Sequence, residues 1–281
     1  MVVPTHNGMP HLKQAVSTVL AQTYPRIELI IVENGSTDGT REWLDGLSDP
    51  RIRIFHQPEL VPVFQNWTTA IELANGEFVK LLCADDFLKP ESISRQVAAL
   101  QANRNAVMAA AKRDICDDWG RTVIRGRGLD GLSEVSTQAE VAAACANAGT
   151  NVLGEPHAVM YRTTSVKTEM PWSSHYPYVV DLDMSMRVLG HGDLVAVRSS
   201  DSVFRLTSGS WSSRLMHEQA SQFAAWMQEL AYNSVGLDDR LLARASKRSA
   251  RNQLARRVVY VGVDARSRML NRLSRRPTGP L

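Results

Sequence analysis

Three short polar segments contain residues that could bind a phosphorylated ligand: Pro4–Gly8, Glu33–Asp38 and the pair Asp85-Asp86. The two adjacent aspartates follow a strand-like run, and like charges this close repel one another in a low dielectric unless a cation neutralises them. Mg²⁺ takes oxygen ligands and combines one or two carboxylates with substrate phosphates. The pair therefore indicates a metal-bridged diphosphate site. Taken alone, it also fits a solvated turn residue at Asp86 and a cap at Asp85.

The same segments lack the motifs of other phosphate-binding enzymes. None of them contains the GxGxxG of a dinucleotide site or the GxxxxGK[ST] of a P-loop. The Gly-rich basic loop that a sugar nucleotidyltransferase needs is also absent from the first segment. Hydride transfer and ordinary ATP hydrolysis are therefore disfavoured.

The elements that must position these segments alternate between strands and helices. Residues 1–3, 27–32, 51–56 and 77–83 have the apolar or β-branched character of strands, whereas 11–22, 40–47 and 67–74 have helical spacing. This alternation predicts an α/β fold with a parallel sheet. Ligands bind beyond the carboxyl ends of such strands, which is where all three polar segments fall.

The pattern weakens further along the chain. Residues 113–149 include several glycines and indicate a loop or hairpin region, with no internal repeat. Short strands are expected at 158–161, 194–197 and 202–206, and a helix at 184–189 that ends at Gly190.

Three motifs together resemble the successive signatures of the inverting family-two glycosyltransferases of GT-A fold. They are Val3–Gly8 (VPTHNG), Ile30–Thr40 (IIVENGSTDGT) and Ala74–Asp86 (ANGEFVKLLCADD), in the family's order and spacing. The resemblance covers roughly residues 1–210. It implies a nucleotide-diphospho-sugar transferase fold, in which a mixed, mostly parallel sheet is flanked by helices.

On the donor side, the resemblance implies that Pro4, Thr5 and Asn7 line the nucleotide pocket. Glu33 stands where the family usually has an aspartate that contacts the uracil or ribose of the donor. Because the side chain here is longer, the identity of the donor base stays open.

The implied metal ligands are Asp85 and Asp86, which match the end of the family's DXD-type motif, with Asp85 near the ribose and diphosphate. Cys83 replaces the motif's frequent first aspartate, so one acceptor of hydrogen bonds from the ribose is lost. The implied cofactor is Mn²⁺ or Mg²⁺.

The segment Tyr178–Gly190 resembles the family's acidic motif before a helix, and the matching carboxylate, Asp181, is the implied general base. Val180 occupies the position of the motif's usual glutamate, which weakens the match. Asp183 lies two residues further on, and since such positions do not share a helix face, we expect only one of the two to point into the site. The alternative for Asp183 is a first-turn acid that the helix dipole favours.

Two more segments resemble acceptor-side parts of the family. Gly154–Arg162 would run under the acceptor site, where His157 either meets the sugar or is structural. Phe204–Ser212 resembles the closing loop, and Thr207 replaces a frequent histidine there, a role that Arg205 or a water would have to take over. Trp211 in that loop either stacks on a sugar or belongs to the core.

The resemblance implies an inverting, metal-assisted glycosyltransferase that moves a sugar from a nucleoside-diphosphate sugar to a glycan or lipid-linked acceptor. One alternative is a non-catalytic relative that binds a sugar nucleotide or glycan, which the departures at Glu33, Cys83, Val180 and Thr207 keep open. A weaker alternative is a metal-dependent nucleotidyl or phosphoryl transferase that uses the same carboxylates.

Charge is distributed unevenly along the 281 residues. Residues 240–281 contain 12 Arg or Lys and one acid, a net charge of +11. Because the whole chain carries +3, residues 1–239 carry −8.

We expect a catalytic domain at 1–215, made of a nucleotide-binding half (1–105) and an acceptor half (106–215), and a helical basic C-terminal extension at 216–281. That extension is either a solvated helix on the body or a contact to an anionic membrane surface. Nucleic acid is disfavoured, because no binding motif is present.

The remaining features concern location and the start of the chain. Three widely spaced cysteines, no leader and no long apolar run predict a cytoplasmic protein, with peripheral association at the inner face of a membrane as an option. Only three residues precede the first polar segment, so we also expect the first strand to be shortened.

Overall fold

The computed structural model describes residues 1–207 and 211–274, and its first part is a parallel sheet. Strands β1 (Val2–Thr5), β2 (Leu29–Glu33) and β3 (Ile52–His56) lie side by side in that order. Thr5 pairs with Glu33, and Glu33 pairs with His56. The strand-helix alternation therefore gives the expected α/β arrangement, with the first two polar segments at the carboxyl ends of β1 and β2.

A second, mixed sheet continues from the first. Its order is β4-β9-β6-β10-β5; β6 and β10 run parallel, β7 pairs with β6, and β8 pairs with β10. The two sheets meet at β1, because Val2 bridges Leu81. The bounds are β4 (Phe78–Val79), β5 (Phe87–Leu88), β6 (Ala106–Cys116), β7 (Thr122–Arg127), β8 (Val135–Ser136), β9 (Val159–Arg162) and β10 (Asp193–Arg205).

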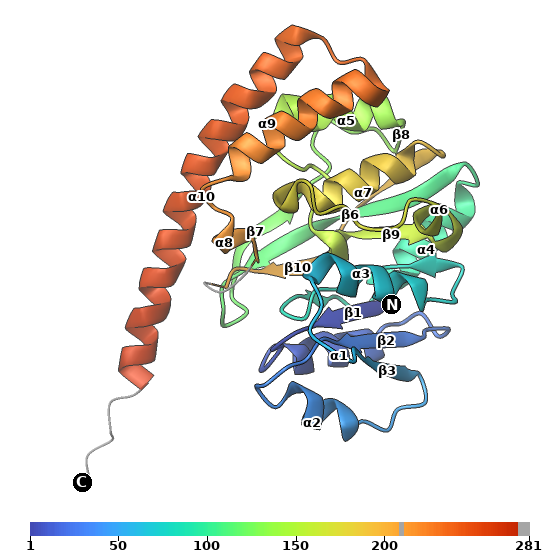
Figure 1. The fold of residues 1–281 in the computed structure, drawn as a ribbon, viewed down its shortest axis with the longest axis vertical. Helices are drawn as coiled ribbons and strands as arrows, with labels where there is room; N and C mark the ends of the chain where they lie inside the picture. Colours follow the sequence, from blue (N-terminus) through green and yellow to red (C-terminus); the bar gives the residue numbers. More distant parts are fainter. Residues whose placement is uncertain (208–210, 275–281) are drawn as a thin grey trace.

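Helices cover both faces of this layer (Figure 1), and the strands divide their side chains between two apolar clusters. Val2, Ile30 and Val32 pack with α3, α5, α7 and α9, whereas Val3 and Ile31 pack with α1, α2 and α4. The helix bounds are α1 (Leu12–Leu20), α2 (Thr40–Asp45), α3 (Val63–Glu72), α4 (Ser92–Ala102), α5 (Gln138–Ala148), α6 (Thr163–Thr168), α7 (Val180–Leu189), α8 (Trp211–Arg214), α9 (Gln219–Leu230) and α10 (Asp239–Ser274). Short turns η1 (Pro156–Ala158), η2 (Pro177–Val179) and η3 (Ala231–Val235) connect them.

Several elements differ from the sequence expectation. The strand expected at 77–83 is only two residues long, because the chain leaves β9 after Val79 and pairs with β1 through Lys80 and Leu82. The two short strands expected near 194–206 form one continuous strand, β10, with register shifts between Val197 and Ser202. The weak region contains α5, which starts with a capping box between Thr137 and Glu140.

The basic C-terminal segment is a helix whose first part packs on the body. In Figure 1, α10 lies beside α9 and α5, and its last turns lie apart from the other elements. Gly149 ends α5 with φ +66°, and a Cβ there would lie 2.5 Å from the Cβ of Arg248, so glycine is needed for α10 to approach this closely. No helix in the described ranges combines the length and apolar character that crossing a bilayer requires.

Candidate active site

The loops after β1 and β2 are tied together by side chains. Asn7 has a left-handed backbone with φ +50°, its Oδ1 accepts from Thr37 N at 2.8 Å, and its own N donates to Ser36 Oγ at 2.9 Å. Met9 N donates to Asp38 Oδ2 at 2.9 Å. The two polar segments therefore form one preorganised ledge at the carboxyl edge of the sheet, and Asn7 serves as its link.

The remaining donor-side candidates lie deeper than the sequence implies. Pro4 and Thr5 are buried within β1. The Glu33 side chain is fully buried: its Oε1 accepts from Ser36 N at 2.5 Å, and its Oε2 lies 3.2 Å from His56 Nδ1. Burial alone would raise the pKa of Glu33, but the hydrogen bonds from Ser36 and His56 outweigh it and lower the pKa. Glu33 thus stabilises its own loop, and in this structure neither of its oxygens is free to contact a donor base.

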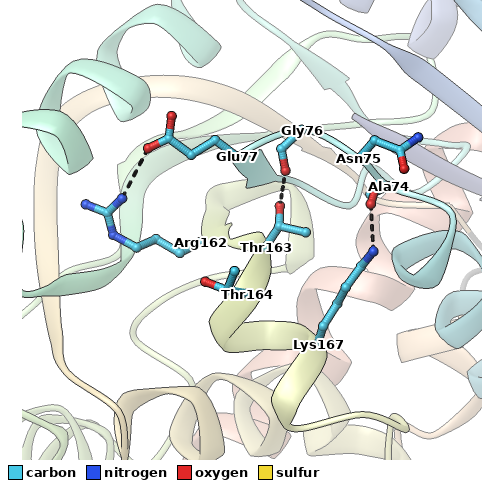
Figure 2. A pocket seen from close by; sticks show the side chains of 8 residues that line it. All are labelled: Ala74, Asn75, Gly76, Glu77, Arg162, Thr163, Thr164 and Lys167. Atoms are coloured by element: carbon cyan, nitrogen blue, oxygen red, sulfur yellow. Dashed lines mark hydrogen bonds and ion pairs between the residues drawn. The ribbon is translucent and has the colours of Figure 1, made fainter.

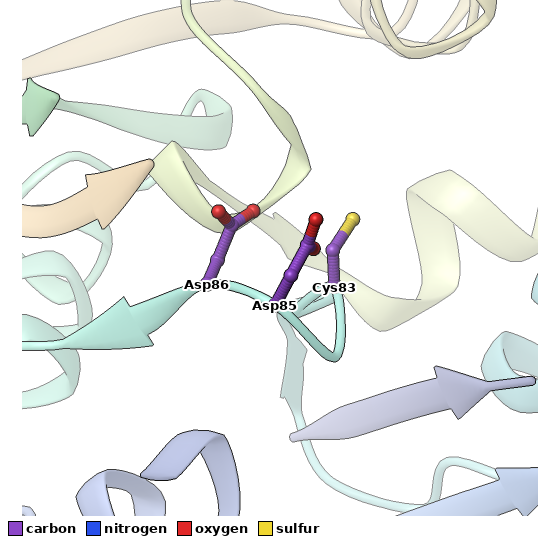
Figure 3. Close-up of side chains that lie close together, drawn as sticks. All are labelled: Cys83, Asp85 and Asp86. Carbon is purple, nitrogen blue, oxygen red and sulfur yellow. The ribbon is translucent and has the colours of Figure 1, made fainter. Parts of the chain in front are cut away.

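Cys83, Asp85 and Asp86 form a group whose ligand atoms all lie within 4.8 Å of one another. Their side chains extend from one tight turn toward the same side (Figure 3). Burial, together with repulsion by Asp86, raises the pKa of Asp85 to about 7. Burial beside both carboxylates likewise raises the pKa of the Cys83 thiol well above its usual range. This concentration of acidic groups is what a divalent cation would relieve.

The two aspartates have different surroundings. Asp86 is 1% exposed; its Oδ1 accepts from Arg205 N at 2.9 Å, and its Oδ2 lies 2.8 Å from His157 Nδ1. Asp85 is partly exposed, and its backbone oxygen accepts from Arg205 Nε at 2.9 Å. Asp86 is therefore the anchored member of the pair, and Asp85 is the one with a side chain available to an incoming ligand.

Arg205 is buried and holds this turn in place. Besides its contacts to both aspartates, its guanidinium donates to Asp118 O at 2.9 Å and to the side-chain oxygen of Gln14. Each of its three guanidinium nitrogens donates one hydrogen bond to this region, which leaves two N–H groups, so a role of Arg205 in place of the closing-loop histidine stays a prediction. Thr207 is the last described residue before the gap at 208–210, so part of that closing loop lies outside the described residues.

His157 is also behind the site rather than on its acceptor side. The side chain is 0% exposed, contacts Asp86, and stacks on Phe204 with a centroid separation of 6.3 Å. This enclosure favours the structural alternative for His157 over a contact with the acceptor sugar. Its position supports Asp86 instead.

Asp181 lies in the first turn of α7 and is partly exposed. Asn151 Nδ2 donates to its Oδ2 at 3.1 Å, and Leu182 N donates to its Oδ1 at 2.8 Å. Burial raises the pKa of Asp181 to about 7, and the nearby Glu155 carboxylate adds to the shift. Glu155 is itself paired with Arg113. A carboxyl that titrates near neutrality and has a fixed orientation has the properties of a general base.

The other acceptor-side candidates take structural partners. Asp183 Oδ1 accepts from Trp226 Nε1 at 3.0 Å and Oδ2 accepts from Arg187 Nε at 3.1 Å, so its carboxylate is engaged with α9 and its own helix. Trp211 is 43% exposed, donates from Nε1 to Pro177 O at 3.2 Å, and packs edge-on against Phe64. Its position at the surface leaves one part of the ring accessible.

A cavity of about 420 Å³ lies elsewhere, between the turn before β4 and helix α6. Figure 2 shows Arg162, Thr163 and Lys167 directed at Glu77, Gly76 and Ala74. Lys167 Nζ donates to Glu72 O and Ala74 O, and Arg162 Nη2 donates to Leu100 O at 2.7 Å. The cations of this cavity therefore bind carbonyl groups at helix ends, and we place the candidate active site at the carboxyl edge of the sheet instead.

Sequence reasoning missed three residues that shape the Asp181 environment, namely Arg113, Asn151 and Glu155. Glu155 stands two residues before His157 in a segment that the motif comparison did select. Asn151 has no motif, and only its hydrogen bond to Asp181 identifies it.

Comparison with known proteins assigns this arrangement to a class. The model for glycosyl transferase family 2 matches residues 1–166, and the chain belongs to that family. Its fold is the GT-A type seen in solved glycosyltransferases. One is Staphylococcus aureus TarS 1–349 with UDP-GlcNAc (TM-score 0.63, 15% identity, 89% of this chain and 70% of that chain). Another is the mannosyltransferase PcManGT from Pyrobaculum calidifontis with GDP-Man and Mn²⁺ (TM-score 0.63, 16% identity, 96% and 79%).

Curated relatives are glycosyltransferases as well. Glycosyltransferase GlyG of Streptococcus pneumoniae is 36% identical over 95 residues, which cover 33% of this chain and 32% of GlyG. The Escherichia coli glucosyltransferase WfgD, named for a GlcNAc-diphosphoundecaprenol substrate, is 27% identical over 108 residues, 38% of this chain and 43% of WfgD. The matched part of the chain spans between 17% and 50% of the length of these curated relatives.

Proposed function

We propose that this glycosyltransferase inverts the anomeric centre of a nucleoside-diphosphate sugar in a single, metal-assisted displacement. The observation that carries the proposal is the pairing of Asp181, whose pKa is about 7, with a separate acidic group at Cys83, Asp85 and Asp86. Asp181 and Asp85 are both close enough to act on the pKa of the Cys83 thiol, so the candidate base and the candidate diphosphate site belong to one centre.

In this mechanism Asp181 takes the proton from the acceptor hydroxyl as its oxygen bonds to the anomeric carbon. The bond from that carbon to the phosphate oxygen breaks on the opposite face, and the nucleoside diphosphate leaves. Asn151 and the backbone N of Leu182 keep the Asp181 carboxylate in one orientation. The hydrogen bond between Asn7 and Ser36 already joins the two loops of the proposed donor site, so these loops need no rearrangement when a donor binds.

The donor set of Cys83, Asp85 and Asp86 fits a divalent cation, because its ligand atoms lie together, and burial and the repulsion by Asp86 already raise the pKa of Asp85. Asp85 is the principal ligand in this proposal, Cys83 a weaker one, and Asp86 the support that Arg205 and His157 hold in place. Mn²⁺ or Mg²⁺, when bound, supplies positive charge that stabilises the departing diphosphate.

The proposed acceptor is a glycan or lipid-linked glycan of the cell envelope. Support comes from the names of relatives, such as WfgD and the putative teichuronic acid glycosyltransferase TuaG of Bacillus subtilis, which is 32% identical over 99 residues.

In the proposed organisation, residues 1–215 form the catalytic domain, with a nucleotide-binding half (1–105) and an acceptor half (106–215). Residues 216–281 form the helical extension against the acceptor half.

We also propose peripheral contact with an anionic membrane surface on the cytoplasmic side. The outward face of α10 first carries cations and then aliphatic side chains at the same alternating spacing of three and four residues. The cations are Arg240, Arg244, Lys247 and Arg251, and the exposed aliphatic residues are Leu254, Val258 and Val261. Each cation near such a surface contributes about 1 kcal/mol, and the aliphatic residues add buried apolar area.

Vesicle sedimentation tests the membrane proposal. The protein should pellet with phosphatidylglycerol vesicles at low ionic strength and be released as salt rises. Reversing Arg240 and Lys247 to glutamate should abolish pelleting, whereas the same reversal at Arg121 and Arg125, on the β6–β7 hairpin, should not. Equal pelleting of both variants would refute the proposal. Point variants are used because deleting α10 would also remove its packing on α5 and α9.

A donor screen tests the enzymatic proposal. UDP-, GDP- and dTDP-sugars are incubated with Mn²⁺, with Mg²⁺ and with chelator, and release of nucleoside diphosphate is measured beside donor binding by calorimetry. Metal-dependent release with one donor is the expected result. Binding of a donor without release in any condition would instead indicate a non-catalytic relative, and release of pyrophosphate would indicate a nucleotidyl transferase.

A further inference from the structure

One arginine of the C-terminal helix reaches the region of the candidate base. Arg256 of α10 donates from Nη1 to Thr150 Oγ1 at 3.2 Å, and its guanidinium lies 5.6 Å from the ring centroid of Tyr178. Thr150 precedes Asn151, which donates to Asp181, and Tyr178 stands three residues before Asp181 in the turn that opens α7. Two separate contacts therefore place Arg256 beside the segments that hold Asp181.

Most of the hydrogen-bonding capacity of this arginine is unused. Nε and Nη2 of Arg256 are buried and have no hydrogen-bond partner among the described residues. Burial of unpaired guanidinium donors is costly, because water can no longer solvate them. An arginine in this state is suited to a ligand that accepts hydrogen bonds and carries negative charge.

A second arginine nearby is also without a counter-ion. Arg127 ends β7, where it is paired in register with Arg113 of β6. The side chain of Arg127 is partly buried and makes no hydrogen bond or ion pair within residues 1–207 and 211–274. Arg113, in contrast, is paired with Glu155. Glu155 therefore forms an ion pair with Arg113, whereas Arg127 and Arg256 have none in the part of the chain that the structure describes.

The segments that carry the two cations lie side by side. Leu129 N, two residues after Arg127, donates to Val152 O at 2.7 Å, and Val152 is two residues after Thr150, which Arg256 contacts. Burial lowers the pKa of Arg127, and the charges of Arg113 and Arg256 lower it further, while Glu155 opposes them. An anion between Arg127 and Arg256 would remove this repulsion and accept the free donors.

We propose that Arg127 and Arg256 bind an anionic group of the acceptor, a phosphate or a carboxylate, next to the hydroxyl that Asp181 deprotonates. This inference rests on the proposed function, and it narrows the acceptor to a negatively charged molecule. The contacts of Arg256 lead to Thr150 and Tyr178 on the Asp181 side. Within the described residues, none of its contacts lead to the turn that carries Asp85, so the donor diphosphate is not the ligand assigned to it.

Calorimetry with small probes tests the inference directly. The full chain is titrated with methyl phosphate, with glucuronate and with neutral methyl glucoside, at constant ionic strength and with chelator so that no cation bridges an anion to Asp85. We expect one or both anions to bind and the glucoside not to bind. Arg127→Ala and Arg256→Ala should each weaken that binding by roughly tenfold or more, the usual effect of removing a charged hydrogen-bonding partner.

Matched controls separate the site from general charge. Arg121→Ala and Arg125→Ala remove exposed cations from the same β6–β7 hairpin, and both should bind the anion as the native chain does. Arg127→Ala breaks no side-chain hydrogen bond, so it tests the site even where Arg256→Ala unfolds the packing of α10. A preference for methyl phosphate assigns a phosphate-bearing acceptor, and a preference for glucuronate assigns an acidic sugar.

Two results would overturn the inference: no binding of either anion by the native chain, or unchanged binding by Arg127→Ala. Donor hydrolysis by water gives an independent measure, because it needs no acceptor. A native chain that binds the anions but releases nucleoside diphosphate from no donor would refute the proposed function alone. A chain that hydrolyses a donor but binds neither anion would refute this inference alone.

Discussion

The regions on the two sides of Asp181 carry uncompensated charges of opposite sign. On the proposed donor side, Cys83, Asp85 and Asp86 share one turn, and burial together with repulsion by Asp86 raises the pKa of Asp85 to about 7. On the proposed acceptor side, Arg256 has buried donors without a partner, and the Arg127 side chain has no ion pair among the described residues. Each side is thus incomplete in a way that a ligand of opposite charge would correct.

The difference also extends to rigidity. The donor loops satisfy their polar groups internally, as the hydrogen bonds from Asn7 to Ser36 and from Ser36 to Glu33 show. The acceptor side leaves guanidinium groups unpaired. The proposed donor side is thus preformed, whereas the proposed acceptor side has hydrogen-bond donors that a ligand would use. The experiments below test whether each side is specialised in this way.

Replacing the residue between the two sides should have the largest effect. Asp181→Asn keeps the shape of the side chain but removes the base, so sugar transfer should fall by roughly 10²–10⁴-fold, while donor affinity measured by calorimetry stays within error. The rate of the native enzyme should rise with pH and level off above about 7, because Asp181, whose pKa is about 7, acts only when deprotonated. The variant should lose this rise.

Asp183→Asn is the matched control, since its carboxylate is engaged with Trp226 and Arg187 rather than with the site. It should lower the thermal midpoint and leave the pH dependence of transfer as it is. Equal losses of transfer in both variants would mean that the assignment of the base to Asp181 is wrong.

The donor side makes a prediction about stability that depends on pH. Asp85→Asn should reduce metal-dependent donor turnover by about 10²-fold or more, because the cation contributes several kcal/mol. In metal-free buffer, however, the same variant should be more stable than the native protein. The native Asp85 pKa of about 7 lies above its value of 3.8 in an unfolded chain, so folding favours the protonated form, and this carboxyl destabilises the native state progressively between those pH values.

The stability difference should therefore be small near pH 4, grow as pH rises, and be complete above about pH 7, which a series of thermal melts would measure. Asp86→Asn provides the contrast. Asp86 accepts from Arg205 N and contacts His157, so its replacement should lower the thermal midpoint at neutral pH. Stabilisation by both variants, or by neither, would show that the two aspartates do not have the different roles that their contacts indicate.

Most of the donor half was predictable because its signals are local. A β-branched run such as Leu29–Glu33 followed by turn residues specifies a strand and its end, and the three motifs lie at the carboxyl ends that a parallel sheet must align. Side-chain direction was not predictable in the same way. Glu33 and His157 have residue types suited to binding, but tertiary packing turns both inward, against His56 and Asp86.

The acceptor half was less predictable because its parts come together only in three dimensions. The Ala-rich segment Ala106–Cys116 has composition that favours helix, and burial between β9 and β10 makes it a strand. Arg256 is 75 positions after Asp181 and belongs to a helix whose basic composition predicts solvent or a membrane. Only its contacts with Thr150 and Tyr178 place this arginine beside the segments that hold Asp181.

The smallest expected effect concerns the one position where the donor side departs from the acidic motif. Cys83 offers sulfur to the same space as Asp85, and sulfur favours softer ions than Mg²⁺. Cys83→Asp supplies a hard oxygen ligand instead, so the concentration of Mg²⁺ that half-activates donor turnover should fall by less than about tenfold, with a smaller change for Mn²⁺. Cys83→Ser removes the sulfur without adding charge and should weaken activation by both ions slightly.

Cd²⁺ gives a readout that does not depend on turnover. The absorption of its bond to the thiolate should appear with the native chain and be lost in Cys83→Ser. Cys116→Ser alters a buried cysteine outside the group and should retain the absorption. If Cd²⁺ absorption persists in Cys83→Ser and the Mg²⁺ requirement of Cys83→Asp is unchanged, then Cys83 does not face the cation and the donor side relies on its two aspartates alone.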